Sequence, residues 1–201
     1  MHASTTKPRR ARIYTLTSMA FGCALLMLSA FLTISIPPMA PVTLQTFAVF
    51  LVTLWLGWKN GFLTVLAYIV CGALGLPVFA GGNGGFGVLV GSTGGYIFGF
   101  LLIPLVSGAL LHLLPCRMLS KYAALTAGLA ACYLFGTIWF THLYSAANGK
   151  IGFLSALLMC VVPYILPDLA KMTVAILLWQ RVAPQVEKLT EKHNQTRRLG
   201  Q

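Results

Sequence analysis

Asp168 and Lys171 are the residues of this chain whose types and spacing most clearly suggest chemistry. Asp168 is the only acidic residue between Met1 and Val186, and it lies inside the apolar run 161–179. Residues three apart share a helix face, so the carboxylate and the ammonium group can point into the same space. An ionisable residue at membrane depth is costly and usually faces a bundle interior, a partner charge or a polar ligand. We therefore expect the pair to bind a polar ligand.

The alternative is that Asp168 and Lys171 form a structural ion pair whose charges neutralise each other. A buried ion pair seldom stabilises a fold more than apolar residues of similar volume do, so stability alone is a weak reason for it. The two interpretations overlap, because a paired Asp and Lys can still hold a ligand between them.

The composition is that of an integral membrane protein. The 201 residues are 58% hydrophobic and 8% charged, with a mean hydropathy of +0.83, whereas a soluble domain carries about 25% charged residues. A cytosolic catalytic domain does not fit. The net charge of +11 does not indicate nucleic acid, because the basic residues lie at the ends of apolar runs, as insertion into a lipid bilayer requires.

Six apolar runs are long enough to be transmembrane helices, at about 20 residues for a hydrocarbon core of about 30 Å. Their limits are 13–36, 42–57, 61–79, 94–114, 120–142 and 152–183. The second is short, and Pro163 and Pro167 should kink or break the last near its start. The first exceeds a signal-peptide core and lacks an A-x-A site, which predicts a retained helix. The expected fold is all-α and polytopic, with residues 1–201 forming one membrane domain.

The basic residues orient these spans. If both termini are inside, twelve of the 14 Lys and Arg residues fall on the inner side of the membrane, whereas Lys150 falls outside and Lys171 lies within the membrane. Such asymmetry is a strong positive-inside signal. It predicts that both termini are cytoplasmic, with basic tails at 1–11 and 185–201.

This orientation places the polar pair toward the outer surface. Counting inward from Arg181 at ~1.5 Å per residue, Asp168 lies roughly 20 Å above the inner face, and Lys171 lies one turn deeper. The Pro-rich turn 35–41, the glycine-rich loop 80–100 and the turn 148–150 fall on the outer face. The pair is thus positioned to receive a ligand from outside.

The glycine-rich loop contains a G-x-G-x-x-G match at Gly82–Gly87 that does not indicate a nucleotide site. A dinucleotide fingerprint needs an acid about 20 residues later, and the next acid is Asp168. A P-loop motif is also absent from the sequence. Glycine allows close backbone approach, and irregular backbone at membrane depth must line a cavity or be buried. We expect a lid or wall over an outward-facing pocket, with polar contacts from Asn83, Ser92, Thr93 and Tyr96. A flexible linker is the alternative, although it would be richer in Ser and Lys.

Gln45 and the pair Ala20 and Ala24 carry weaker signals. Gln45 stands alone in an apolar span, where its amide could bind a ligand or bridge two helices. Ala20 and Ala24 are four residues apart, a small-xxx-small spacing that lets helices approach closely but is common in membrane bundles.

The cysteines and histidines do not predict a metal site. No C-x-x-C occurs, and the four histidines show no H-x-x-x-H or H-x-x-E spacing. We interpret the five cysteines as small buried hydrophobic residues. They are Cys23, Cys71, Cys116, Cys132 and Cys160.

Three segments together resemble the BioY family, the biotin-binding substrate subunits of energy-coupling-factor (ECF) transporters. They are Pro41-Val-Thr-Leu-Gln-Thr46, the stretch Gly75–Phe100 and Leu166-Pro-Asp-Leu-Ala-Lys171. The family often has Pro where this chain has Ser92. The resemblance implies a six-helix S-component in a bacterial cell (inner) membrane that binds biotin from outside with high affinity. It also implies a transmembrane coupling subunit and a pair of ATP-binding subunits as partners, with no cofactor.

The resemblance also implies roles for individual residues. By this resemblance, ligand binding is assigned to Asp168, Lys171, Asn83, Gly85 and Tyr96. Ala20 and Ala24 are assigned the contact with the coupling subunit. The chemistry of biotin suggests further contacts. Asp168 could accept a ureido N–H, Asn83 or Gln45 could complete that ring, and Lys171 could hold the carboxylate, or the ligand could lie the other way round. Tyr96, with Phe79 or Phe86, could cover the rings.

Two other classes of function are alternatives for a small polytopic membrane protein. A proton-coupled secondary transporter of a small organic acid could use Asp168 as its proton carrier, and its uptake would depend on the proton gradient at constant ATP. A membrane-embedded hydrolase needs a nucleophile with a base, or a metal cluster. One Asp and the helix-end residues His112 and His142 provide neither, so we do not expect an enzyme.

Overall fold

A computed structural model of the chain describes residues 6–34, 42–115, 117–149 and 151–199. The described chain is a bundle of helices with one two-residue antiparallel strand pair, in which Thr33 faces Thr43. The Pro-rich turn 35–41, Cys116 and Lys150 lie outside the described residues. The elements in chain order are α1 (Thr6–Phe31), β1 (Thr33–Ile34), β2 (Val42–Thr43), α2 (Gln45–Ala73), η1 (Ala80–Gly82), α3 (Phe86–Val90), α4 (Gly94–Gly99), α5 (Leu102–Leu113), α6 (Met118–Asn148), α7 (Phe153–Cys160) and α8 (Val162–Leu199).

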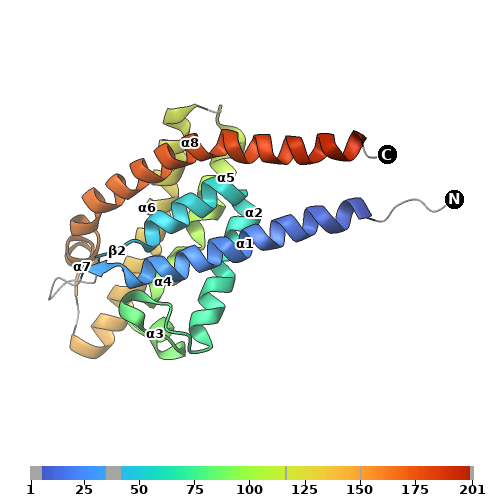
Figure 1. Cartoon of the computed structure of the whole chain (residues 1–201). Coiled ribbons are helices and arrows are strands. Elements are labelled where there is room, and N and C mark those ends of the chain that lie inside the picture. The colour runs from blue at the N-terminus through green and yellow to red at the C-terminus, as the bar shows by residue number, and fades with distance from the viewer. Residues whose placement is uncertain (1–5, 35–41, 116, 150, 200–201) are drawn as a thin grey trace.

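Five helical stretches of the described chain are long and apolar enough to cross a membrane. This agrees with the expected all-α, multi-pass class. The stretches are Arg12–Phe31, Gln45–Ala73, Gly94–Leu113, Met118–Ala146 and Val162–Val186. The N-terminal end of α1 and the C-terminal end of α8 extend from the same side of the bundle (Figure 1).

The second stretch, α2, contains a break where two separate spans were expected. Gly57 has φ 71° and ψ −173° inside this helix, a backbone conformation that glycine adopts without steric cost. Figure 1 shows the two halves of α2 running in different directions. The predicted span 61–79 also extends too far. The helix ends at Ala73, and Gly75 with φ 100° then turns the chain before Pro77.

The predicted span 152–183 is divided into α7 and α8. Val161 has non-helical φ −121° and ψ −51° between them. Pro163 follows in the first turn of α8, where its missing N–H breaks no helical hydrogen bond, whereas Pro167 lies within the helix. A break near the start of this run was expected, and it lies at Val161, two residues before Pro163, whereas α8 continues through Pro167.

The glycine-rich segment is more regular than a lid of irregular backbone. The segment 80–100 includes η1, α3 and α4. Residues 75–93, which precede α4, form the glycine-rich wall. Glycines in the wall and in α4 permit close packing. A Cβ on Gly84 would lie 2.2 Å from the Leu76 carbonyl oxygen, and one on Gly95 would lie 2.3 Å from Trp139 Cβ. The segment therefore packs tightly against its neighbours.

The core lies between the long helices and beside the polar pair. Large side chains with less than 2% exposure come from α1, α2, α5, α6 and α8. They include Leu26, Phe50, Tyr68, Ile103, Leu125, Met172 and Ile176. The most extensive helix contacts join α5 to α6 and α1 to α2. This packing fixes the helix faces from which the site residues project.

Candidate functional site

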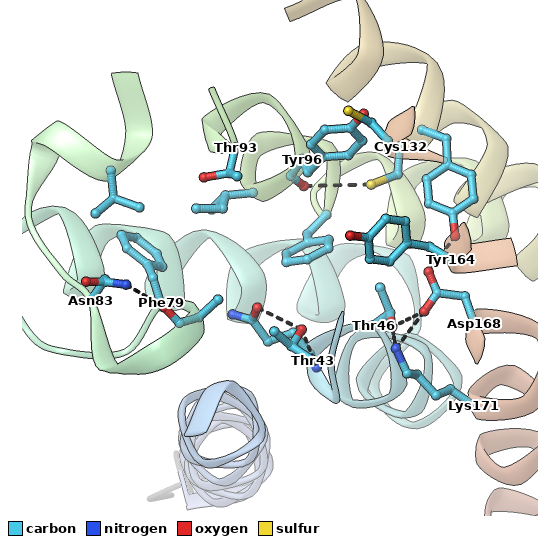
Figure 2. A pocket seen from close by; sticks show the side chains of 17 residues that line it. Thr43, Thr46, Phe79, Asn83, Thr93, Tyr96, Cys132, Tyr164, Asp168 and Lys171 are labelled. Atoms are coloured by element: carbon cyan, nitrogen blue, oxygen red, sulfur yellow. Dashed lines mark hydrogen bonds and ion pairs between the residues drawn. The ribbon is translucent and has the colours of Figure 1, made fainter. Parts of the chain in front are cut away.

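A cavity of ≈ 310 Å³ contains the Asp168–Lys171 pair. Its volume is at the lower end of the range of about 300–1,000 Å³ that is usual for small-molecule pockets. Figure 2 shows the 17 residues that line it. They are Thr43, Gln45, Thr46, Phe79, Ala80, Asn83, Val88, Thr93, Tyr96, Ile97, Phe100, Cys132, Tyr133, Cys160, Tyr164, Asp168 and Lys171.

Asp168 is held by donors from three helices. Lys171 Nζ lies 2.7 Å from its Oδ1 atom, the Thr46 hydroxyl donates to the same oxygen at 2.8 Å, and the Tyr133 hydroxyl donates to Oδ2 at 2.5 Å. Asp168 is only 3% exposed. A carboxylate withdrawn from water in this way needs such donors, because an unpaired buried charge is strongly unfavourable.

Thr46 links the two charged groups a second time. Lys171 Nζ donates to Thr46 Oγ1 at 3.3 Å, and the Thr46 hydroxyl donates onward to Asp168. A carboxylate has about four acceptor positions and an ammonium group has three N–H donors. The contacts named here use three of the former and two of the latter. The pair therefore retains hydrogen-bonding capacity toward the cavity.

The opposite end of the cavity is formed by the glycine-rich wall. Figure 2 shows Asn83 and Phe79 across the cavity from Asp168 and Lys171. The Asn83 side-chain amide donates to the Ala80 carbonyl at 2.7 Å, and Phe79 N–H donates to the Asn83 carbonyl at 2.8 Å. The lining also includes the apolar side chains of Val88, Ile97 and Phe100. The site thus combines polar groups at two ends with apolar side chains in its lining.

Tyr96 is fixed between α4 and α6. Its hydroxyl lies 3.1 Å from Thr137 Oγ1, and its ring lies against Gly136, where an added Cβ would be 2.2 Å from the ring. The Cys132 thiol also approaches the Tyr96 carbonyl at 3.7 Å. Glycine at 136 therefore lets the ring approach α6 closely.

The cavity brings together six of the eight expected ligand contacts. Asp168, Lys171, Asn83, Tyr96, Gln45 and Phe79 line it, together with Thr93. Gly85 and Phe86 are not among its lining residues, and Phe86 is 67% exposed. Gln45 uses its side-chain amide to bridge Thr43 and Tyr68. Ala20 and Ala24, the expected docking residues, are both exposed on α1.

Several lining residues were not expected from the sequence. Tyr133, on α6, and Tyr164, on α8, are aromatic residues in apolar runs that contain other aromatic residues, so nothing in the sequence singles them out. Thr46 follows Gln45 in a segment that the resemblance already included. Thr43 and Thr46 flank Gln45 and both bear a hydroxyl group. Thr46 could therefore have been identified as a candidate hydrogen-bond partner for Asp168.

The part of the chain that the structure describes contains no group of three His, Cys, Asp or Glu residues able to hold a metal ion. Four of the five cysteines are described there as free thiols. Cys132 and Cys160 line the cavity, and Cys132 is 1% exposed.

The long apolar helices define a multi-pass membrane protein, and the ligand-sized cavity among them is its candidate small-molecule site. Comparison with known proteins identifies its family. A sequence model of the BioY family matches residues 3–188, and the chain belongs to this family.

The sequence aligns with individual relatives over most of their length. The chain is 37% identical to the "Probable biotin transporter BioY" of Pyrococcus horikoshii, over 81% of this chain and 92% of that protein. It is 40% identical to the "Biotin transporter BioY" of Thermotoga maritima, over 79% and 89% respectively.

A similar fold has been solved. The crystal structure of the S-component for biotin from an ECF-type ABC transporter matches with a TM-score of 0.77 and 27% identity, over 91% of this chain and 95% of that chain. The S component of a bacterial ECF transporter matches with a TM-score of 0.56 and 17% identity, which shows similarity of fold alone.

Proposed function

We propose that this protein takes up biotin, acting as the substrate-binding subunit of an ECF-type transporter. The observation that carries the proposal is the Asp168–Lys171 pair inside a ligand-sized cavity, in a chain similar to biotin transporters and to an S-component for biotin. The role is that of a transporter subunit and not of an enzyme. Biotin is the transported substrate, and the proposal assigns the protein no cofactor.

The chemistry of biotin fits the distribution of polar groups. Its ureido ring has two N–H donors and one carbonyl acceptor, its thiophane ring is apolar, and its side chain ends in a carboxylate. The cavity has hydrogen-bonding groups at both ends, and its lining includes apolar side chains. The remaining capacity of Asp168 suits an N–H donor, and that of Lys171 suits a carboxylate or carbonyl oxygen.

The proposal includes a topology and a set of partners. The two halves of α2 on either side of Gly57 make six membrane segments, with both termini in the cytoplasm of a bacterium and the glycine-rich wall on the outer side. In this topology the protein binds biotin from outside the cell with high affinity. A transmembrane coupling subunit and a pair of ATP-binding subunits supply the energy, and the exposed residues Ala20 and Ala24 dock to the coupling subunit.

The first test is calorimetric titration of biotin into the purified protein in detergent. We expect saturable, tight binding with one biotin per chain, and folded protein that binds no biotin would contradict the proposal. Biotin methyl ester, which lacks the carboxylate charge, reports whether Lys171 holds the carboxylate. In cells or vesicles, uptake that fails when the proton gradient is collapsed at constant ATP would instead favour the proton-coupled transporter.

Replacing Tyr133 by Phe is expected to weaken biotin binding about tenfold, since hydrogen bonds to charged groups contribute about 1.5–3 kcal/mol. The change removes the donor 2.5 Å from Asp168 Oδ2 and retains the ring. The dissociation constant from the same titration is the measurement. Thr141→Val is the matched control, because the Thr141 hydroxyl on the same helix donates only to the Thr137 carbonyl among its described contacts. An equal effect of both changes would contradict a specific role for Tyr133.

Replacing Ala20 by Trp is expected to leave biotin binding intact and to abolish energised uptake. Ala20 is exposed on α1 and outside the cavity, so a large side chain there obstructs a docking helix without altering the site. Binding is measured by titration and uptake with labelled biotin in cells that contain the complete transporter. Leu28→Trp, at a 65% exposed position of the same helix, is the control for bulk alone. Normal uptake by the Ala20→Trp variant would contradict the proposal that this face of α1 docks to the coupling subunit.

A further inference from the structure

We propose that a hydrogen-bond relay beside the cavity sets the separation of two of its walls, and that Tyr68 is the central positioning residue of this relay. One wall carries Thr43 and Gln45, and the other is the glycine-rich wall. The relay consists of Thr43, Gln45, Tyr68 and Val78. It joins the β1–β2 strand pair to the glycine-rich wall through α2. The proposal rests on the proposed function, because its consequence is a change in ligand binding.

The relay runs in one direction. The Thr43 hydroxyl donates to Gln45 Oε1 at 3.1 Å, the Gln45 side-chain N–H donates to the Tyr68 hydroxyl oxygen, and that hydroxyl donates to the Val78 carbonyl at 3.0 Å. The backbone N–H of Gln45 also donates to Thr43 Oγ1 at 3.3 Å. Each donor thus meets one acceptor, and successive bonds in such a chain polarise one another.

Burial makes the relay sensitive to any missing member. Gln45 is 4% exposed, Tyr68 is 0% exposed and Val78 is 6% exposed. A buried polar group whose partner is removed loses its hydrogen bond without regaining one to water. Removal of the Tyr68 hydroxyl leaves both the Gln45 amide and the Val78 carbonyl without this partner, so segments on both sides must adjust.

Both ends of the relay belong to the ligand site, although Tyr68 does not line the cavity. Thr43 and Gln45 are lining residues, and Val78 precedes the lining residue Phe79. The Tyr68 ring meets the Phe79 ring edge to face at 5.7 Å. Phe79 also lies so close to Gly72 that an added Cβ there would be 2.1 Å from its ring. The Tyr68 ring therefore positions the glycine-rich wall through Phe79. The Tyr68 hydroxyl links this wall to Gln45 and Thr43 on the other side.

The experiment compares Tyr68→Phe with Thr53→Val. Tyr68→Phe keeps the ring contact and deletes the hydroxyl. Thr53→Val deletes another buried hydroxyl on α2, one that donates to the Val49 carbonyl at 2.7 Å within its own helix. We expect Tyr68→Phe to weaken biotin binding about five- to tenfold, and Thr53→Val to change it less than about twofold, since only the former breaks a link between cavity walls.

A mutant cycle tests whether the relay acts as a unit. Thr43→Val and Tyr68→Phe should be non-additive in biotin affinity by about threefold or more, because both interrupt the same chain. Thr43 and Tyr68 are joined through Gln45, so in a Gln45→Leu background the two changes should become additive. Non-additivity that persists in this background would overturn the relay.

Amide hydrogen exchange without ligand provides an independent measurement. Leu44 N–H donates to the Leu32 carbonyl at 3.2 Å beside the β1–β2 strand pair, and Phe79 N–H donates to the Asn83 carbonyl at 2.8 Å in the glycine-rich wall. Tyr68→Phe should accelerate exchange in peptides covering both amides, whereas Thr53→Val should accelerate neither. Unchanged exchange in Tyr68→Phe would overturn the relay.

The binding results separate the two levels of inference. If the wild-type protein binds no biotin, the proposed function is overturned, and the role of Tyr68 in ligand binding with it. If the wild-type protein binds biotin and Tyr68→Phe binds it equally well, the relay is overturned and the proposed function stands. Weakened binding in Tyr68→Phe, with normal binding in Thr53→Val, supports the relay.

Discussion

Replacing Asp168 by Asn is expected to weaken biotin binding by about thirtyfold or more. Truncating one member of a buried, hydrogen-bonded charge pair costs about 2 kcal/mol or more in binding, and about 1.4 kcal/mol corresponds to tenfold in affinity. The change leaves Lys171 without its partner at 2.7 Å and removes a charged acceptor of Thr46 and Tyr133. Calorimetric titration of biotin measures the effect, with Lys171→Met expected to weaken binding as well.

The double variant Asp168→Asn with Lys171→Met distinguishes a ligand site from a structural ion pair. Breaking a buried pair destabilises a protein by about 3–5 kcal/mol, whereas removing both charges can be neutral. We therefore expect the double variant to regain much of the thermal stability that Asp168→Asn loses, while biotin binding stays weak. Recovery of binding together with stability would mean that the pair serves the fold alone.

Replacing Gly94 by Ala is expected to disrupt the cavity and to destabilise the protein by about 1–3 kcal/mol or more, as overpacking of a core does. A Cβ at this position would lie 1.8 Å from the Leu89 carbonyl oxygen and 2.5 Å from its carbon. Both are backbone atoms, so no side-chain rotation can relieve the clash. The start of α4 must then shift, and Thr93, Tyr96 and Ile97 would move with it. Thermal unfolding and biotin titration measure the two effects.

Gly87→Ala is the control for Gly94→Ala. A Cβ at Gly87 meets nothing within 4 Å, and the residue lies inside the short helix α3, where Ala is favoured over Gly by up to about 1 kcal/mol. Its stability should be unchanged or slightly raised, and its biotin affinity unchanged. If Gly94→Ala behaved like Gly87→Ala, close packing would not explain the glycines of this segment.

The membrane class could be predicted because hydropathy depends on composition and not on contacts. The ends of the helices could be predicted only in part. The break at Gly57 coincides with the predicted end of the span 42–57, and the helix then resumes directly. Beyond Gly75 the residues Leu76 and Val78 are as apolar as those of a span, but they lie in an irregular segment after α2, which hydropathy alone cannot distinguish from a helix.

The site could be predicted where charge is rare. Asp168 and Lys171 stand out because a buried charge needs a reason, and the structure places both in the cavity. Tyr133 does not stand out, because its role depends on α6 packing beside α8, a contact between residues 35 apart in sequence. The sequence is compatible with Gln45 as either a ligand contact or a helix bridge. In the structure its side chain lines the cavity and also bridges Thr43 and Tyr68.

The glycine-rich wall limits how this site can be altered. Gly81, Gly82 and Gly85 have positive φ, which disfavours any side chain, and Gly84 has no room for one. These four positions disfavour any side chain, so they fix the backbone path on which the wall presents its lining side chains. Those side chains are Phe79, Ala80, Asn83, Val88 and Thr93. Evolution or engineering toward a different ligand can therefore replace lining side chains of the wall and of the helices, such as Thr46, Ile97 and Tyr133, but it cannot readily move the wall itself.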